Sequence, residues 1–243
     1  MLFLKDVKHI ILAILVCSFA IFMGLSSAEI YYKKTAAQLL TTTYNLPLSH
    51  KTNIYNKPSS YNGLVAVADV DASFVIDLHY AKDNNFTGKK IYPSETCLLQ
   101  KDTLKKLINA NNEFKQYGYR IKIWDAYRPY DVQKHLWSIV SDSRFIANPY
   151  YHGSRHNRGA AVDITLVDGQ GHELEMPTGF DNFTTASYRN STSMSSTAKK
   201  NMDLLTSVMV KHGFKTIETE WWHFDDSNAD SYPLLNVQFE DIK

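Results

Sequence analysis

The sequence predicts an α+β fold, in which a small and mainly antiparallel sheet is flanked by helices within a single domain. Segments with apolar residues at three-and-four spacing are separated along the chain by short segments of strand character. The links between them are short, which permits antiparallel pairing of strands. The composition, 44% hydrophobic and 21% charged over 243 residues, is that of a globular protein and excludes fibrous and disordered chains.

Three segments are predicted to be helices. The first runs from about residue 102 to a stop before Gly118, and the third runs from about residue 195 to 212, where Gly213 ends it. The second begins at Pro129, a residue suited to the first helical position. Its apolar positions are expected to face the core: Val132, Leu136, Ile139 and Val140.

Four segments are predicted to be strands, because they are short and rich in β-branched and aromatic residues or alternate in polarity. They are Phe74–Tyr80, Tyr119–Trp124, Ala161–Val167 and Thr216–Phe224. Alternation in the third strand places Asp163 opposite Val162 and Ile164, so that its carboxylate points away from the core.

The chain begins with a predicted secretory signal peptide over residues 1–28. Lys5 and Lys8 form a basic start, residues 10–25 are apolar, and Ser26-Ser27-Ala28 offers small residues for cleavage. An uncleaved membrane anchor is the alternative, although the apolar stretch is marginal for a full span. We therefore expect an exported protein, periplasmic or secreted.

Residues 29–62 are predicted to be an N-terminal extension or linker, and residues 63–243 the folded domain. The whole chain has 26 basic and 25 acidic residues; the signal peptide contains two of the former and one of the latter, so 24 of each remain after cleavage. This neutral balance gives no indication of nucleic-acid binding, nor of a stable membrane partner once the signal peptide is removed. The oligomeric state is not defined by the sequence.

Two short segments far apart in the chain carry the side chains of a hydrolytic zinc site. Ser154–Asp163 supplies an imidazole and a carboxylate, and Glu220–Phe224 supplies a second imidazole and a further glutamate. A catalytic zinc needs three protein ligands and one open position, and a nearby carboxylate can accept the proton of an attacking water. A regular strand would send Glu220 and His223 to opposite faces, so a bulge, a strong twist or a turn is expected near Trp221.

Two other kinds of site contain some of the same residue types. Two histidines and one aspartate also bind Fe(II) in oxygenases. A metal-stabilised binding domain without enzymatic activity is the other alternative, because a fold alone does not fix a function. The six residues between His156 and Asp163, together with Glu220 beside His223, fit hydrolysis better, and a binding domain does not need Glu220.

From about residue 70 onward the chain resembles the D-alanyl-D-alanine dipeptidases, the VanX-type branch of a zinc peptidase family that also includes D,D-carboxypeptidases. The matching segments occur in the family's order: Asp77–Ala81, Asn85–Gly88, Trp124–Pro129, His156–Asp163, Phe180–Asp181 and Glu220–His223. The resemblance implies a zinc D,D-peptidase-like domain. Ala126 departs from the pattern, since glycine is common there, and the N-terminal arm is additional to the compact cytoplasmic members.

The resemblance implies a role for each of eight residues. One zinc ion per chain is bound by His156, Asp163 and His223. Glu220 is the general base and acid, and Arg128 stabilises the oxyanion. The free amino end of the dipeptide is held by Tyr80, Ser154 and Asp181.

The implied activity is hydrolysis of the small dipeptide D-Ala-D-Ala to free D-alanine. The alternative within the same class is a D,D-carboxypeptidase or endopeptidase, which would act on longer peptidoglycan peptides with the same metal. The pair Trp221-Trp222 before His223 resembles the dipeptidase branch more closely.

Overall fold

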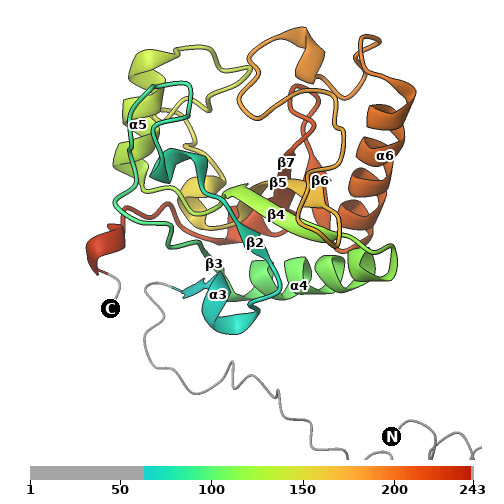
Figure 1. The fold of residues 1–243 in the computed structure, drawn as a ribbon. Coiled ribbons are helices and arrows are strands. Elements are labelled where there is room, and N and C mark those ends of the chain that lie inside the picture. Colours follow the sequence, from blue (N-terminus) through green and yellow to red (C-terminus); the bar gives the residue numbers. More distant parts are fainter. Residues whose placement is uncertain (1–62, 242–243) are drawn as a thin grey trace, which may run out of the picture. The chain divides into compact units, whose positions relative to one another are not determined.

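The computed structural model describes residues 63–241, so the predictions for residues 1–28 and 29–62 lie outside the described residues. A five-stranded sheet has the order β2-β4-β5-β7-β6 (Figure 1). Its strands are β2 (Val75–Ile76), β4 (Arg120–Asp125), β5 (Ala161–Val167), β7 (His223–Asp226) and β6 (Phe214–Thr216). β2 is parallel to β4 and the other neighbours are antiparallel, which confirms the predicted α+β class with a mainly antiparallel sheet.

A smaller antiparallel sheet pairs β1 with β3, and four α-helices complete the described part of the chain. The bounds are β1 (Leu64–Ala66), β3 (Leu98–Gln100), α3 (Val67–Val70), α4 (Lys101–Gln116), α5 (Tyr130–Ile139) and α6 (Ser196–Lys211). Five short 3-10 helices lie in the connections: η1 (His79–Ala81), η2 (His156–Arg158), η3 (Thr185–Ser187), η4 (Ala229–Ser231) and η5 (Phe239–Asp241). Within residues 63–241, none of the helices combines the length and the apolar character that a membrane span requires.

The three predicted helices are confirmed as α4, α5 and α6. Ser195 caps α6, because its hydroxyl accepts a hydrogen bond from the backbone nitrogen of Ala198 (3.0 Å). In α5 two details of the prediction were wrong. Pro129 is the residue before the helix rather than its first turn, and Ile139 at the opposite end is 47% exposed. The helix instead buries a polar residue, Gln133, beside the site described below.

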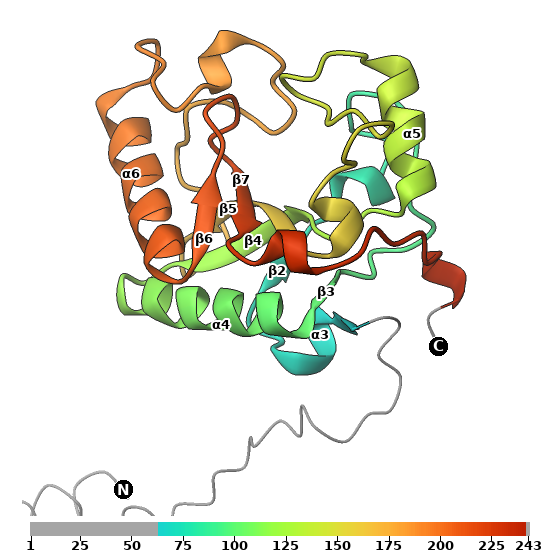
Figure 2. The same cartoon turned by 180° about the vertical axis from the view of Figure 1, so that it is seen from behind.

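The helices lie on different sides of the five-stranded sheet. α4 packs against β4, α6 packs against β6, and the two helices contact each other. Figures 1 and 2 show that α4 runs along one side of the sheet, whereas α5 lies on the other side. β5, the central strand, is buried along its whole length. One end of β5 is paired on one side with the end of β4 and on the other with the start of β7, so side chains from three strands meet there.

Two of the four predicted strands were wrong in their extent. Residues 74–80 form a strand only at Val75–Ile76, since the Leu78 carbonyl accepts a hydrogen bond from Ala81 (3.0 Å) and turns the chain into η1. Residues 216–224 belong to two strands, β6 and β7, with an irregular connection between them. The other two predicted strands are confirmed as β4 and β5.

Gly159 makes the tight turn that joins η2 to β5. Its φ is +65°, and its carbonyl accepts a hydrogen bond from the backbone nitrogen of Gln100 (2.8 Å). A Cβ atom at this position would lie 2.3 Å from Cδ2 of Leu64. Glycine is therefore required both for the backbone conformation and for the close approach of the β1–β3 sheet.

Candidate active site

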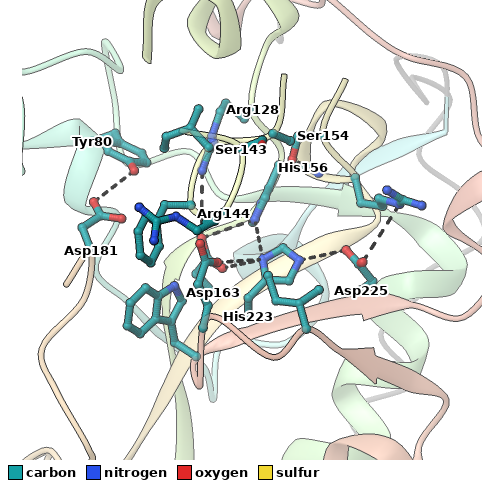
Figure 3. Close-up of a pocket in the computed structure, with 17 residues that line it drawn as sticks. Tyr80, Arg128, Ser143, Arg144, Ser154, His156, Asp163, Asp181, His223 and Asp225 are labelled. Atoms are coloured by element: carbon teal, nitrogen blue, oxygen red, sulfur yellow. Dashed lines mark hydrogen bonds and ion pairs between the residues drawn. The ribbon is translucent and has the colours of Figure 1, made fainter. Parts of the chain in front are cut away.

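Three predicted metal ligands converge at the end of the sheet. Asp163 of β5 and His223 of β7 are direct partners across the antiparallel pair, and His156 enters from η2. His223 Nδ1 lies 2.9 Å from Asp163 Oδ1 and 3.2 Å from His156 Nε2 (Figure 3). One donor atom from each residue lies within 4.8 Å of the others, and all three residues are buried. The sequence prediction that these side chains come together is thus matched by the geometry.

Hydrogen bonds on the far side of each ring determine which nitrogen faces this point. His156 Nδ1 lies 2.7 Å from the carbonyl of Ala126, and since a carbonyl can only accept, Nδ1 carries the proton and Nε2 is left free. His223 lies between two carboxylates, with Nε2 2.9 Å from Asp225 Oδ1 and Nδ1 2.9 Å from Asp163 Oδ1. Burial opposes the charge of His223, but Asp225 and Asp163 outweigh it and raise the pKa of His223 well above its ordinary value. A metal ion would take the place of the proton on Nδ1, so that both imidazoles could bind it beside Asp163.

The donor set fits a divalent metal ion. Burial opposes the ionisation of Asp163, but the two imidazoles outweigh it and hold the pKa of this carboxyl well below its usual range. Two neutral imidazoles and one carboxylate are a set that catalytic zinc uses, with a fourth position left for water or substrate. These three residues can hold a metal ion without any rearrangement of the strands.

Glu220 lies beside the three ligands. Its Oε2 is 3.9 Å from His223 Nδ1, and the residue is only 7% exposed. Burial raises the pKa of Glu220 to about 8, and the negative charges of Asp163 and Asp181 act in the same direction. A carboxylate with a raised pKa can both accept and return a proton near neutral pH.

The irregular connection before β7 resolves the expected conflict between Glu220 and His223. Glu220 precedes the strand, so strict alternation does not apply to it. Two residues outside the sheet bind the connection's backbone. Ser187 accepts a hydrogen bond from the Trp221 nitrogen (3.1 Å), and Arg189 donates to the carbonyls of Ile217 and His223 (2.9 Å each). The irregularity expected near Trp221 is thus a bend just before β7, not a bulge within the strand. The register shift in this sheet lies in β4, between Ile123 and Asp125.

Arg128 is held rigidly at the opposite wall of the site. Its Nε donates to Asp125 Oδ2 (3.0 Å), its Nη1 donates to Gln133 Oε1 (2.9 Å), and its Nη2 lies 4.0 Å from Asp163 Oδ2. Burial opposes its charge, but Asp125 outweighs burial and raises the pKa of Arg128 well above its ordinary value. The site thus contains a fixed cation next to the ligand carboxylate.

The residues expected to hold an amino group form a second end of the site. Tyr80 donates its hydroxyl hydrogen to Asp181 Oδ2 (3.0 Å), and Figure 3 shows this pair apart from the imidazoles. Burial, reinforced by the charge of Asp163, raises the pKa of Asp181 well above its ordinary value. Asp181 has a φ of +54°, the one positive value at a non-glycine residue among residues 63–241. Strained backbone of this kind persists where the surroundings hold a side chain in place.

All eight residues selected from the sequence line one cavity of about 230 Å³. They are Tyr80, Arg128, Ser154, His156, Asp163, Asp181, Glu220 and His223. Ser154 also fixes the turn, because its hydroxyl accepts a hydrogen bond from the backbone nitrogen of His156 (3.2 Å). The cavity is smaller than the range of about 300 to 1,000 Å³ typical for drug-sized ligands, which favours a small substrate.

Four supporting residues were missed at the sequence level: Asp125, Gln133, Arg189 and Asp225. Two of them left a signal in the sequence. Asp225 follows His223 by two positions, the spacing that puts side chains on one face of a strand, and Asp125 precedes Arg128 by three positions. Arg189 and Gln133 left none, because their role depends on contacts that only the tertiary fold creates.

Comparison with known proteins identifies the family of the chain. The family model described as D-ala-D-ala dipeptidase, Peptidase_M15, matches residues 60–242. The chain is 39% identical to the D-alanyl-D-alanine dipeptidase of Escherichia coli (strain K12), over 72% of this chain and 91% of the relative. It is 27% identical to that of Enterococcus faecium, over 64% of this chain and 89% of the relative.

Among solved structures, the LD-carboxypeptidase LdcB aligns with 77% of this chain and 81% of its own, with a TM-score of 0.37 and 20% identity. The sequence analysis left three kinds of protein open: a hydrolase, an Fe(II) oxygenase and a binding domain. The family model and the sequence relatives are peptidases, which selects the hydrolase. The chain therefore belongs to the D-Ala-D-Ala dipeptidase family, and it is a peptidase.

Proposed function

We propose that this protein hydrolyses the dipeptide D-Ala-D-Ala to two molecules of D-alanine, with one zinc ion held by His156, Asp163 and His223. The observation that carries the proposal is the position of Glu220, whose carboxylate lies 3.9 Å from the metal-facing nitrogen of His223. A bound zinc ion would polarise the scissile carbonyl and lower the pKa of a water molecule toward about 7.

The side chains of the protein divide the proton transfers and the charge stabilisation between them. Glu220 accepts a proton from water as the water oxygen forms its bond to the carbonyl carbon. Arg128 stabilises the negative charge that develops on the carbonyl oxygen, held in place by Asp125 and Gln133. Glu220 then gives the proton to the leaving nitrogen as the carbon–nitrogen bond breaks, and the products are a carboxylate and a free amine.

Asp181 and Tyr80 explain a preference for dipeptides. In the absence of a cation, burial disfavours the ionised form of Asp181, as its raised pKa indicates. The ammonium group of a dipeptide supplies the missing positive charge, and Ser154 lines the same cavity. A longer peptide would place a neutral amide there and leave the carboxylate without an ionic partner, which costs binding energy.

The test is to incubate the full-length protein and zinc with D-Ala-D-Ala, with L-Ala-L-Ala, and with a longer peptide ending in D-Ala-D-Ala. Release of free amine from D-Ala-D-Ala alone is the expected result. Cleavage of the longer peptide would instead assign the protein to the carboxypeptidase or endopeptidase alternative. No cleavage of D-Ala-D-Ala in the presence of zinc would contradict the proposal.

We also propose that the protein is exported, on the strength of the basic start, apolar stretch and small-residue site within residues 1–28. The mature protein then begins at Glu29, with residues 29–62 as a linker before the catalytic domain of residues 63–243. Cell fractionation with N-terminal sequencing tests this. A periplasmic or secreted protein that begins at Glu29 is expected, whereas a full-length protein in the membrane fraction would indicate an uncleaved anchor.

A further inference from the structure

Asp225 is a partly buried carboxylate that lines the cavity, and the mechanism above gives it no role. It follows His223 by two positions in β7, and its side chain is 16% exposed. Its Oδ1 lies 2.9 Å from His223 Nε2, the nitrogen on the far side of the ring from Asp163. Figure 3 shows Asp163 and Asp225 on opposite sides of the His223 imidazole. Asp225 therefore touches a metal ligand without belonging to the ligand set.

The two imidazoles of the site are held by different kinds of partner. The ring of His156 donates to a neutral backbone carbonyl, that of Ala126. The ring of His223 faces the carboxylate of Asp225. An ionised carboxylate has no proton to donate, so it acts only as a hydrogen-bond acceptor. A carboxylate behind a metal-binding imidazole fixes its tautomer and orientation and increases its basicity more than a neutral acceptor does.

A second contact ties Asp225 to the other ligand segment. Nε of Arg155 lies 4.0 Å from Asp225 Oδ2, and Nη2 of the same arginine lies 3.3 Å from Asp230 Oδ1. Arg155 immediately precedes His156 in the chain. The guanidinium thus links the turn that supplies one imidazole to the carboxylate that orients the other.

We propose that Asp225 is a positioning residue for the metal site, which holds His223 in the tautomer with its proton on Nε2 and leaves Nδ1 as the ligand atom. This inference rests on the proposed zinc site and extends it to the residue behind the ligand. Removal of Asp225 takes away the acceptor that holds the proton on Nε2 and lets the ring turn, so Nδ1 is less often placed to bind the metal. The consequence is weaker metal binding with the three ligands still in place.

The first test is zinc affinity, measured on the full-length protein by competition with a chromophoric chelator. Asp225→Ala is expected to weaken zinc binding about 10- to 100-fold, the range observed for such partners in other metal sites. Asp225→Asn is expected to fall between Asp225→Ala and the wild type, because an amide oxygen can accept the same hydrogen bond without the charge. Asp230→Asn is the matched control, since it removes a carboxylate from the same arginine without touching His223, and it should bind zinc within twofold of the wild type.

Thermal melting of the metal-free variants shows whether they fold. If Asp225→Ala binds zinc as tightly as the wild type, the inference is wrong and the proposed function stands. If the wild type itself binds no zinc, both are wrong.

The second test needs no variant. Nitrogen-15 NMR of the histidine rings in the zinc-loaded wild type reports the position of each proton. The expected result for His223 is a proton on Nε2 and none on Nδ1. A proton on Nδ1, with Nε2 toward the metal, would overturn the inference even if every variant failed to fold.

Discussion

Asp163 and His223 lie directly opposite each other on β5 and β7, with 2.9 Å between Asp163 Oδ1 and His223 Nδ1. On the other side of β5, Asp163 is paired with Asp125 of β4, the residue that holds Arg128. The site is thus built on a row of side chains across three neighbouring strands. Because a shift of one residue in either pairing would turn these side chains to the other face, strand register sets the spacing of the site.

Replacement of Glu220 should separate catalysis from metal binding. Glu220→Gln removes the proton acceptor but none of the three ligands. We expect kcat for D-Ala-D-Ala to fall about 10²- to 10⁴-fold, the usual contribution of a general acid–base group, with unchanged zinc content. Steady-state kinetics and metal analysis measure the two effects. The matched control is Glu218→Gln, an exposed change in the same connection, which should retain wild-type activity. Normal turnover by Glu220→Gln would remove Glu220 from the mechanism.

The raised pKa of Glu220 predicts a pH dependence of stability in the metal-free protein. A carboxyl group with a folded pKa of about 8 binds its proton more tightly in the folded state than in the unfolded state, where its pKa is 4.5. Its stabilising effect is complete below the unfolded value and is lost as the pH rises through the folded value.

Glu220→Gln should therefore melt at a higher temperature than the wild type at pH 9, with the difference shrinking toward pH 5. Scanning calorimetry in the presence of a chelator measures it. A difference that is the same at both pH values would show that Glu220 does not titrate in this range.

The strained backbone of Asp181 permits a clean test of its role. Asparagine tolerates positive φ at least as well as aspartate, so Asp181→Asn should fold with a melting temperature close to that of the wild type. Its carbonyl can still accept the hydrogen bond from Tyr80, but the charge is lost. We expect KM for D-Ala-D-Ala to rise at least tenfold and kcat to change less. Unaltered kinetics would show that another group holds the ammonium.

The same variant should lose discrimination at the amino end. An N-acetylated dipeptide carries no ammonium, so the wild type should strongly prefer the free dipeptide. In Asp181→Asn the ratio of the two kcat/KM values should move toward one. An unchanged ratio would place the recognition of the amino end elsewhere in the cavity.

Arg189 is expected to support both Glu220 and His223 through the backbone. Its guanidinium bonds to the carbonyls of Ile217 and His223 and to the hydroxyl of Thr206, and it lies over the ring of Phe224 at 4.8 Å. Arg189→Lys keeps the charge but cannot make these bonds together.

We expect Arg189→Lys to lose about 1 to 3 kcal/mol of stability, because buried carbonyls lose their donors, and to lose activity beyond what unfolding explains. Denaturant titration and kinetics below the transition measure the two. Wild-type kinetics in the folded variant would contradict a role in placing the connection.

The sequence was sufficient for the helices and for the central strands, because their patterns are local. α4 and α6 have apolar residues at helical spacing with clear ends, and β5 is a continuous buried run. It was not sufficient for residues 74–80 and 216–224, where strand-like composition continues past the end of the sheet. There the outcome depends on tertiary hydrogen bonds, such as those of Arg189, which no local pattern encodes.

The eight site residues could be selected because they occur in motifs that resemble a known family, and all eight line one cavity. The supporting residues were harder to find. Gln133 lies on a helical face that the pattern assigned to the core, and its burial makes sense only beside Arg128. That partner is known only once the fold is known, so the sequence pattern alone does not identify the role of Gln133.

The most direct test of the account is the position of the metal ion. A crystal of the zinc-loaded protein, measured on both sides of the zinc absorption edge, gives an anomalous difference map that locates zinc without reference to the protein atoms. We predict one strong peak per chain, within about 2.0 to 2.2 Å of His156 Nε2, an oxygen of Asp163 and His223 Nδ1. A peak elsewhere, or no peak between these three side chains, would contradict it.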